Sequence, residues 1–123
     1  MTEENRIERD RAGLRAAINI MTQWQLAEKD QAEILRVPPE LLKNPDSATG
    51  LSTDQLERLS YLLNIHAELR ELFQNPENHG LYINSRNQNS PFDGRSPLEL
   101  IQTGGKKGLD EVFRHLEIIK YGQ

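Results

Sequence analysis

The chain has no cysteine among its 123 residues. Disulfides, thiolate metal sites and cysteine nucleophiles are therefore excluded. Long apolar runs are also missing, because no segment approaches the ~18 residues that a membrane-spanning helix needs. The first residues, Met1 to Glu4, are polar and acidic, so we expect no signal peptide. These absences predict a soluble protein of the cytoplasm.

Basic residues do not outnumber acidic residues either. The formal net charge is −4, from 15 Lys and Arg against 19 Asp and Glu. No segment forms the kind of basic patch that binds nucleic acid through release of counterions. Residues 97–123 nevertheless hold as many basic as acidic groups, so the tail lacks the acidic excess of the rest.

The alternation of β-branched residues that is typical of strands does not occur, and apolar residues recur at helical spacing. This pattern predicts a helix over about residues 7–23 and a second over 27–35. Pro38-Pro39 begins a third, short helix that Pro45 ends. At this length we expect one domain, or one core with a small appendage, and an all-α fold.

Two capping boxes mark the start of later helices. Ser52 with Gln55 begins a long helix whose apolar stripe includes His66 and which Asn75-Pro76 ends. Ser96 followed by Pro97 and Glu99 begins a second helix, with Leu98 and Ile101 facing inward, which Gly104-Gly105 ends. Between these two helices, Tyr82-Ile83 is followed by a segment that we interpret as a polar loop holding Asn87.

A last amphipathic helix places most of its apolar residues on one side: Leu109, Val112, Phe113, Leu116 and Ile119. Ile118 lies off that stripe, and Gly122 follows as a terminator. An apolar residue away from the core face indicates contact with another chain, although single exposed apolar residues are also common and need no cause. Both interpretations stay open on these grounds.

Residues 27–45 look like a helix-turn-helix. Small or apolar residues stand where two helices must meet: Ala32, Leu35, Val37 and Leu42. However, Arg36 replaces the usual turn glycine, and Pro45 shortens the second helix. Residues 24–47 carry three basic and five acidic groups, a net charge of −2, whereas a helix that reads DNA normally brings basic or amide groups. A helix-turn-helix retained for packing is therefore a serious alternative to one that reads DNA.

Catalytic signals are scarce. The three histidines are too far apart for a metal motif, and a histidine on an apolar helix stripe is more often a core residue than a ligand. The segment Gly104–Gly108 lacks the spacing of a phosphate-binding loop. We interpret the pair Glu68 and Glu71, and the pair Asp110 and Glu111, as solvent-facing charges. No set of nucleophile and base is present, so the sequence predicts neither an enzyme nor a metal or cofactor site.

Residues 24–122 resemble the Xre/MbcA/ParS family of type II antitoxins. The likeness is weak over Trp24 to Val37 and moderate in the helix that begins at Leu51-Ser52. It is strongest in the last third of the chain, where the matching positions are Tyr82-Ile83, Asn87, Gly94 to Leu100, Thr103-Gly104, Gly108-Leu109, Val112, Leu116 and Tyr121-Gly122. Two positions depart from the family pattern: Tyr82 replaces a tryptophan, and Arg86 replaces a proline. Both changes preserve an aromatic anchor and a loop.

The resemblance implies three parts: residues 1–50 with an Xre-like helix-turn-helix, residues 51–75 as a connecting and dimerisation helix, and residues 76–123 as a toxin-binding domain. It also implies a homodimer whose partner is a RES-domain toxin, an enzyme that consumes NAD. The C-terminal segment would block the toxin's cleft, with Lys106 or Lys107 nearby. The implied toxin-binding residues are Arg114, Ile118, Ile119, Lys120, Tyr121, Gly122 and Gln123.

Many members of the family also bind the promoter of their own operon. The residues that would contact operator DNA here are Gln31, Arg36, Lys43 and Asn44. Two hypotheses result: an antitoxin that inhibits a toxin by occlusion, and a helix-turn-helix transcriptional regulator whose C-terminal part only dimerises it. For Lys120 alone, a solvated cation at a helix C-terminus is the simpler alternative to a toxin contact.

Overall fold

The computed structural model describes residues 2–122, and over these residues the chain is helical with no β-strand. The elements are α1 (Glu3–Gln23), α2 (Glu28–Leu35), α3 (Pro39–Lys43), the short 3₁₀ helix η1 (Pro45–Ser47), α4 (Thr53–Leu72), α5 (Glu77–Asn84), α6 (Pro97–Gly104) and α7 (Lys106–Tyr121). The predicted all-α fold is confirmed.

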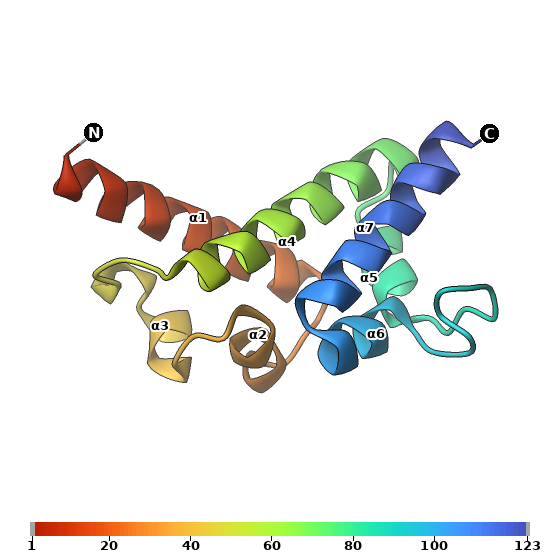
Figure 1. The fold of residues 1–123 in the computed structure, drawn as a ribbon, viewed down its shortest axis with the longest axis horizontal. Helices are drawn as coiled ribbons and strands as arrows, with labels where there is room; N and C mark the ends of the chain where they lie inside the picture. Colours follow the sequence, from red (N-terminus) through yellow and green to blue (C-terminus); the bar gives the residue numbers. More distant parts are fainter. Residues whose placement is uncertain (1, 123) are drawn as a thin grey trace.

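The long helix α4 organises the molecule (Figure 1). It crosses α1 at its N-terminal half and packs along α7 at its C-terminal half. Helices α2 and α3 lie below the crossing of α1 and α4, and α6 lies against the first turns of α7. Residues 2 and 122 are at opposite ends of the molecule.

Local sequence signals explain where the main helices begin. Ser52 Oγ accepts a hydrogen bond from the backbone N–H of Gln55 at 3.1 Å, and Gln55 Oε1 accepts one from the N–H of Ser52 at 2.9 Å. Ser96 and Glu99 form the same reciprocal pair at the start of α6. Both predicted capping boxes are confirmed, since each satisfies backbone donors that the first helical turn leaves free.

One local expectation needs correction. Helix α1 begins at Glu3 rather than near residue 7, because Thr2 caps it and accepts a hydrogen bond from the N–H of Asn5 at 3.1 Å. Tyr82-Ile83 lies near the end of helix α5, and Asn87 follows it outside any helix, as expected of the polar loop. Asn75 caps the first turn of α5, because its Oδ1 accepts a hydrogen bond from the N–H of Glu77 at 3.1 Å, and tertiary contacts bury Ile83 completely. The irregular segment is the one between α5 and α6.

The core is apolar and continuous from α1 to α7. Its fully buried large side chains include Trp24, Phe92, Leu14, Met21, Leu62, Ile65, Leu69, Leu109 and Leu116. Burial of this kind is worth about 25 cal/mol per Å² of apolar surface. In α6 the buried residues are Pro97, Leu100 and Ile101, whereas Leu98, expected to face inward, is only half-buried.

Polar bonds join the first helix to the loop before α4. The carboxylate of Asp10 is buried, and its Oδ2 accepts a hydrogen bond from the backbone N–H of Leu51 at 3.0 Å. At the next residue, Arg11 Nε donates to the carbonyl of Ala48 at 2.8 Å. Because a lost partner of a buried group costs more than an ordinary hydrogen bond contributes, these bonds fix where α4 begins relative to α1.

Candidate functional site

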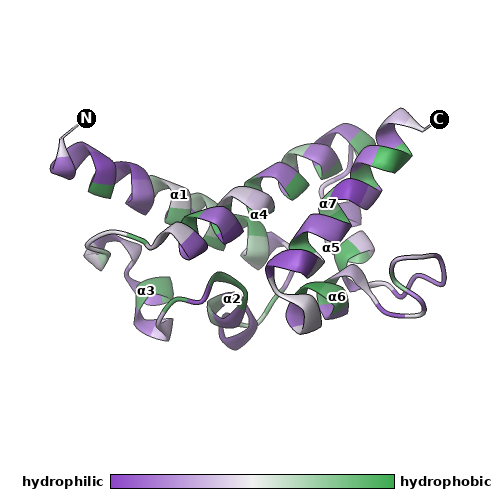
Figure 2. Ribbon diagram, in the orientation of Figure 1, coloured by the Kyte–Doolittle hydropathy of each residue, from purple (hydrophilic) through white to green (hydrophobic). Residues whose placement is uncertain are grey.

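Helix α7 has two contrasting faces. Leu109, Val112 and Leu116 are fully buried, and they face the helices α4 and α6 that α7 packs against. Arg114, Ile118 and Tyr121 are exposed and spaced by four and three residues, so they share the opposite face. We call these three residues the outer stripe. Figure 2 shows hydrophobic colour on the last turns of α7, amid hydrophilic surroundings.

The outer stripe is unusual for the surface of this protein. Among the described residues, three large hydrophobic side chains are largely exposed: Leu81 at 62%, Ile118 at 67% and Tyr121 at 71%. Two of the three therefore lie within one helical turn at the end of α7. Leu81 belongs to a separate groove of about 580 Å³ beside the end of α1. The sequence-based observation that Ile118 lies off the core face is confirmed.

Polar contacts hold the middle of α7 on α4. The Tyr61 hydroxyl donates a hydrogen bond to Asp110 Oδ1 at 2.9 Å, and Arg114 Nε donates to Asp110 Oδ2 at 2.7 Å. Arg114 and then Tyr61 hold the pKa of the Asp110 carboxyl below its usual value, and the carboxylate in turn raises the pKa of the Tyr61 hydroxyl. Asp110 therefore orients Arg114, rather than facing solvent as the sequence suggested.

A second group of charges lies where α7 begins. Lys106 Nζ lies 2.9 Å from Asp54 Oδ1 and 3.0 Å from Glu57 Oε2, so it joins α7 to the start of α4. Arg58 Nε bonds the same Asp54 at 2.9 Å. A cavity of about 420 Å³ lies beside these groups, and Arg36 and Lys107 also line it. The loop after α6 and the turn of the helix-turn-helix are thus neighbours.

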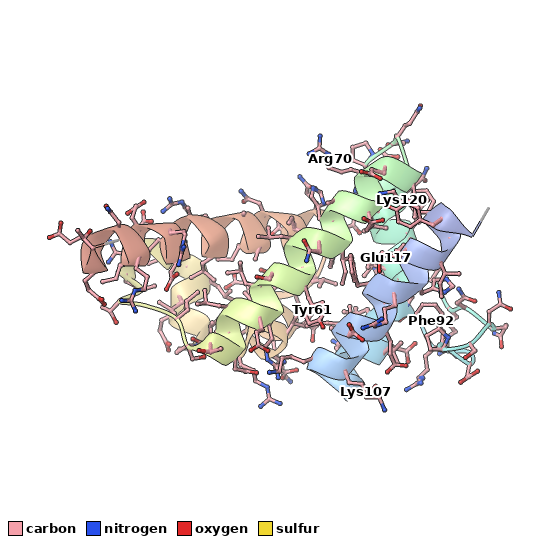
Figure 3. All side chains as sticks on the ribbon, turned by 45° about the horizontal axis from the view of Figure 1, so that its top comes forward. Tyr61, Arg70, Phe92, Lys107, Glu117 and Lys120 are labelled. Carbon is pink, nitrogen blue, oxygen red and sulfur yellow. The ribbon has the colours of Figure 1, made fainter. Side chains whose placement is uncertain are left out.

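At the other end of α7, Lys120 turns toward α4. Its Nζ pairs with Glu71 Oε2 and lies 3.6 Å from Glu68 Oε1. Glu71, followed by the Tyr121 hydrogen-bond contact, raises the pKa of the Lys120 ammonium. The Lys120 side chain is only 22% exposed and that of Glu68 only 13%. Lys120 is therefore not a solvated lysine (Figure 3). Glu68 does not face solvent either, although the sequence had suggested that it would.

The candidate toxin-binding residues consequently divide between two faces. Arg114, Ile118 and Tyr121 lie outside, whereas Ile119 is half-buried and Lys120 faces α4. Gly122 caps the helix, with its N–H 2.6 Å from the carbonyl oxygen of Ile118. Gln123, also proposed from the sequence, lies outside the described residues. No pattern in the sequence indicated that Glu68 and Glu71 would meet Lys120, because about fifty residues separate them.

The helix-turn-helix is present, but one proposed DNA contact is not on the surface. Gln31 is only 3% exposed, and its Nε2 donates to the carbonyl of Leu26 at 2.9 Å and to Thr22 Oγ1 at 3.3 Å. The prediction that Gln31 contacts DNA is therefore corrected. Its amide instead stabilises the turn that joins α1 to α2, which satisfies buried backbone that would otherwise lack a partner.

The remaining DNA candidates are accessible. Arg36 adopts the left-handed conformation, at φ 59° and ψ 43°, that a glycine would adopt more easily. The turn between α2 and α3 thus keeps the backbone conformation that glycine usually provides, although an arginine stands there. Lys43 and Asn44 are exposed at the end of α3, a helix of only five residues that carries Glu40 in its first turn. This second helix presents few groups to a DNA groove.

The histidines are packed side chains. His66 and His79 make an edge-to-face contact with ring centroids 5.7 Å apart, and His79 Nε2 lies 3.2 Å from the carbonyl oxygen of Phe73. Burial lowers the pKa of His66, and the neighbouring His79 contributes. His115 meets the ring of Phe92 edge to face at 4.8 Å. Residues 2–122 contain no group of three or more His, Asp and Glu arranged to hold a metal.

Comparison with known families agrees with this architecture. Residues 3–64 match the antitoxin Xre-like helix-turn-helix domain, and residues 68–122 match the antitoxin Xre/MbcA/ParS C-terminal toxin-binding domain. The chain belongs to the Xre/MbcA/ParS antitoxins. The helix-turn-helix part comprises α1 to the middle of α4, and the toxin-binding part contains the outer stripe.

One relative is similar over most of its length. The uncharacterized protein y4oB of Sinorhizobium fredii (strain NBRC 101917 / NGR234) is 32% identical over 113 residues, which are 90% of this chain and 86% of that protein. No solved structure matches this chain. Across residues 2–122 no helix is long and apolar enough to cross a membrane. The family identifies the protein as the antitoxin of a toxin–antitoxin system, with a toxin as its partner.

Proposed function

We propose that this antitoxin neutralises a NAD-consuming RES-domain toxin by occluding the toxin's active-site cleft with the end of α7. The observation that carries the proposal is the exposure of Ile118 and Tyr121 on one face of that helix. The supporting argument is the likeness of the last third of the sequence to antitoxins that act in this way. The antitoxin would act in the cytoplasm as a homodimer.

The chemistry of the outer stripe suits an occluding contact. Tyrosine provides a large amphipathic area at a small cost in conformational entropy, and it is enriched among residues that dominate binding energy. Ile118 adds apolar area beside it, and Arg114 offers donors that remain 71% exposed although Asp110 fixes the guanidinium. A rigid helix that presents these groups loses less freedom on binding than a disordered tail would.

Removal of residues 119–123 tests this proposal. We expect the shortened protein to lose neutralisation of the co-expressed toxin while it retains its helical circular dichroism and its dimeric elution. The buried anchors Leu109, Val112 and Leu116 all remain in the shortened chain, which is the reason to expect folding. Undiminished rescue of toxin-expressing cells by the shortened protein would reject occlusion by this segment.

A single substitution tests the same contact without shortening the chain. Ile118→Asp places a charge in the outer stripe, and Leu81→Asp places one at an equally exposed leucine elsewhere. We expect only the first to restore NAD consumption by the purified toxin in the presence of antitoxin. Equal effects of the two substitutions would indicate that any surface charge disturbs the complex, and would count against a specific role for α7. NAD levels that the isolated toxin leaves unchanged would reject the NAD-consuming partner.

Operator binding is a second candidate function, and the cationic groups around the turn of the helix-turn-helix favour it. Arg36, Lys106 and Lys107 line one cavity, which brings the start of α7 beside the turn. We propose that these residues contact DNA phosphates while Lys43 and Asn44 approach the groove. Such phosphate contacts would compensate for the short α3.

Band shifts with the promoter region of the antitoxin's own operon test this second function. The double variant Lys43→Ala, Asn44→Ala should weaken binding and relax its sequence preference. Lys107→Ala should weaken binding to all sequences alike and lower the slope of log K against log salt by about 1. Band shifts that none of these changes affects would leave the helix-turn-helix without a role in DNA binding.

A further inference from the structure

An ion pair joins Lys120, in the last turn of α7, to Glu68 and Glu71 of α4. Lys120 Nζ pairs with Glu71 and lies 3.6 Å from Glu68 Oε1. Two of the three side chains are mostly buried, with exposures of 22% for Lys120 and 13% for Glu68. Surface ion pairs usually contribute little, because water and salt screen them. This pair is better shielded than a surface pair.

The ion pair lies where the apolar packing of α7 ends. Leu109, Val112 and Leu116 are fully buried, but no later residue up to 122 is. Helix ends fray when tertiary contacts do not hold them, because their terminal carbonyls lack helical partners. The contact of Lys120 with α4 therefore lies at the point where the helix most needs an attachment. Figure 3 shows Lys120 beside the C-terminal end of α4 and Lys107 at the opposite end of α7.

The same lysine also bears on the outer stripe. Its Nζ lies 4.8 Å from the centre of the Tyr121 ring, within the range of a cation–π contact. The ammonium thus bonds the two carboxylates of α4 and also contacts the exposed ring. Because Tyr121 is 71% exposed, few other groups restrict its orientation. An anchored Lys120 consequently orders both the backbone and the ring that follow it.

We propose that Lys120 is a positioning residue: it acts through Glu68 and Glu71 to hold the outer stripe in the conformation that binds the toxin, and does not itself contact the toxin. This inference rests on the proposed function of the α7 end. It reassigns one residue that the family resemblance placed among the toxin contacts. It also gives α4, through two glutamates, a part in toxin recognition.

The two assignments of Lys120 predict opposite effects of removing its partners. If Lys120 only positions the stripe, replacing Glu68 and Glu71 by glutamine weakens toxin binding as much as Lys120→Met does. If Lys120 contacts the toxin, the same glutamine variant frees the ammonium and leaves binding unchanged or tighter. The cycle of Lys120→Met, Glu68→Gln with Glu71→Gln, and their combination measures this coupling.

The expected size of the effect follows from the population of the ordered end. The apparent dissociation constant rises in inverse proportion to the fraction of molecules in the binding conformation. If loss of the ion pair lowers that fraction to about one in ten, Lys120→Met and the double glutamine variant each raise Kd about tenfold. The combined variant should then also show about a tenfold increase rather than a hundredfold one. Lys120→Arg, which can keep both ion pairs, should bind as the unchanged protein does.

A measurement on the free antitoxin makes the inference independent of the toxin. Amide hydrogen exchange of residues 117–122 should be faster in Lys120→Met and in the double glutamine variant, and unchanged in Lys120→Arg. Exchange in the buried part of α7, around Val112, should be the same in all four proteins. Unchanged exchange at 117–122 would overturn the positioning role.

The outcomes separate this inference from the proposed function. If the protein without residues 119–123 fails to neutralise the toxin but the double glutamine variant binds it normally, occlusion stands and the positioning role of Lys120 is wrong. If the shortened protein neutralises the toxin fully, the proposed function fails. In that case faster exchange in the Lys120 variants would still establish the attachment of the helix end, but without a role in toxin binding.

Discussion

Replacing Gly108 by alanine should destabilise the antitoxin because this glycine lies where α6 and α7 meet most closely. A Cβ added at residue 108 would lie 2.2 Å from the carbonyl oxygen of Leu100 and 3.0 Å from the Cα of Ile101. Both neighbours are backbone atoms, which cannot rotate away as a side chain could. The two helices would have to separate, and with them the buried contacts of Leu109.

The magnitude combines two opposing effects. Overpacking a tight contact costs about 1–3 kcal/mol, and a rigid backbone neighbour places this substitution at the upper end. Alanine is intrinsically better than glycine within a helix by up to about 1 kcal/mol. The net expectation is a loss of about 2 kcal/mol from a total that is typically about 5–15 kcal/mol. For a chain of this size the loss corresponds to a decrease in Tm of about 8 °C.

Urea denaturation followed by circular dichroism measures the loss, with Gly104→Ala as the matched control. Gly104 is the last residue of α6, and a Cβ added there meets no atom within 4 Å. We expect this control to be as stable as the unchanged protein or up to about 1 kcal/mol more stable. The midpoint should fall for Gly108→Ala with an unchanged slope. Equal midpoints for Gly108→Ala and the unchanged protein would refute the close approach of α6 and α7.

Three further predictions concern local features. Ser52→Ala and Ser96→Ala each remove a capping box and should each lower the free energy of unfolding by about 1 kcal/mol, and a loss below 0.3 kcal/mol in urea titrations would contradict the cap assignment. Arg36→Gly should raise stability by about 0.5–1 kcal/mol, because glycine adopts the left-handed conformation without strain; a clear loss would show that the arginine side chain contributes more than its backbone costs. Burial lowers the pKa of His66 and His115 below 6.5, so the folded state binds fewer protons than the unfolded state, and stability should fall as the pH decreases through about 6.5. Glutamine at both histidine positions should reduce that pH dependence in thermal melts, and an unchanged slope would assign it to other groups.

Much of the fold follows from the sequence because its signals are local. The capping boxes at Ser52 and Ser96 involve residues three positions apart, and the stripe of Leu109, Val112 and Leu116 reflects the helical repeat. Arg36 shows the limit of such patterns. The missing glycine weakened the helix-turn-helix prediction, yet the arginine adopts the glycine-like conformation.

The errors arose where distant contacts overrode local preference. Gln31 has the amide side chain typical of a DNA-reading residue, but α2 packs against α3, α4 and α6, and Gln31 is buried with its amide bonded to Leu26 and Thr22. In α6, contacts with other elements bury Leu100 and Ile101 and leave Leu98, which was expected to face inward, half-buried. In both cases the free energy came from burial between elements, which periodicity within one segment does not reveal.

The sequence by itself determined that this protein is all-α, where α4 and α6 begin, and that Ile118 lies away from the core. Each of these depends on residues within a turn or two of one another. Only the tertiary structure decided which groups face Lys120, how closely α6 approaches Gly108, and that Tyr61 of α4 bonds Asp110. These contacts depend on how α7 is rotated and placed against α4 and α6, which is set by the packing of the whole core.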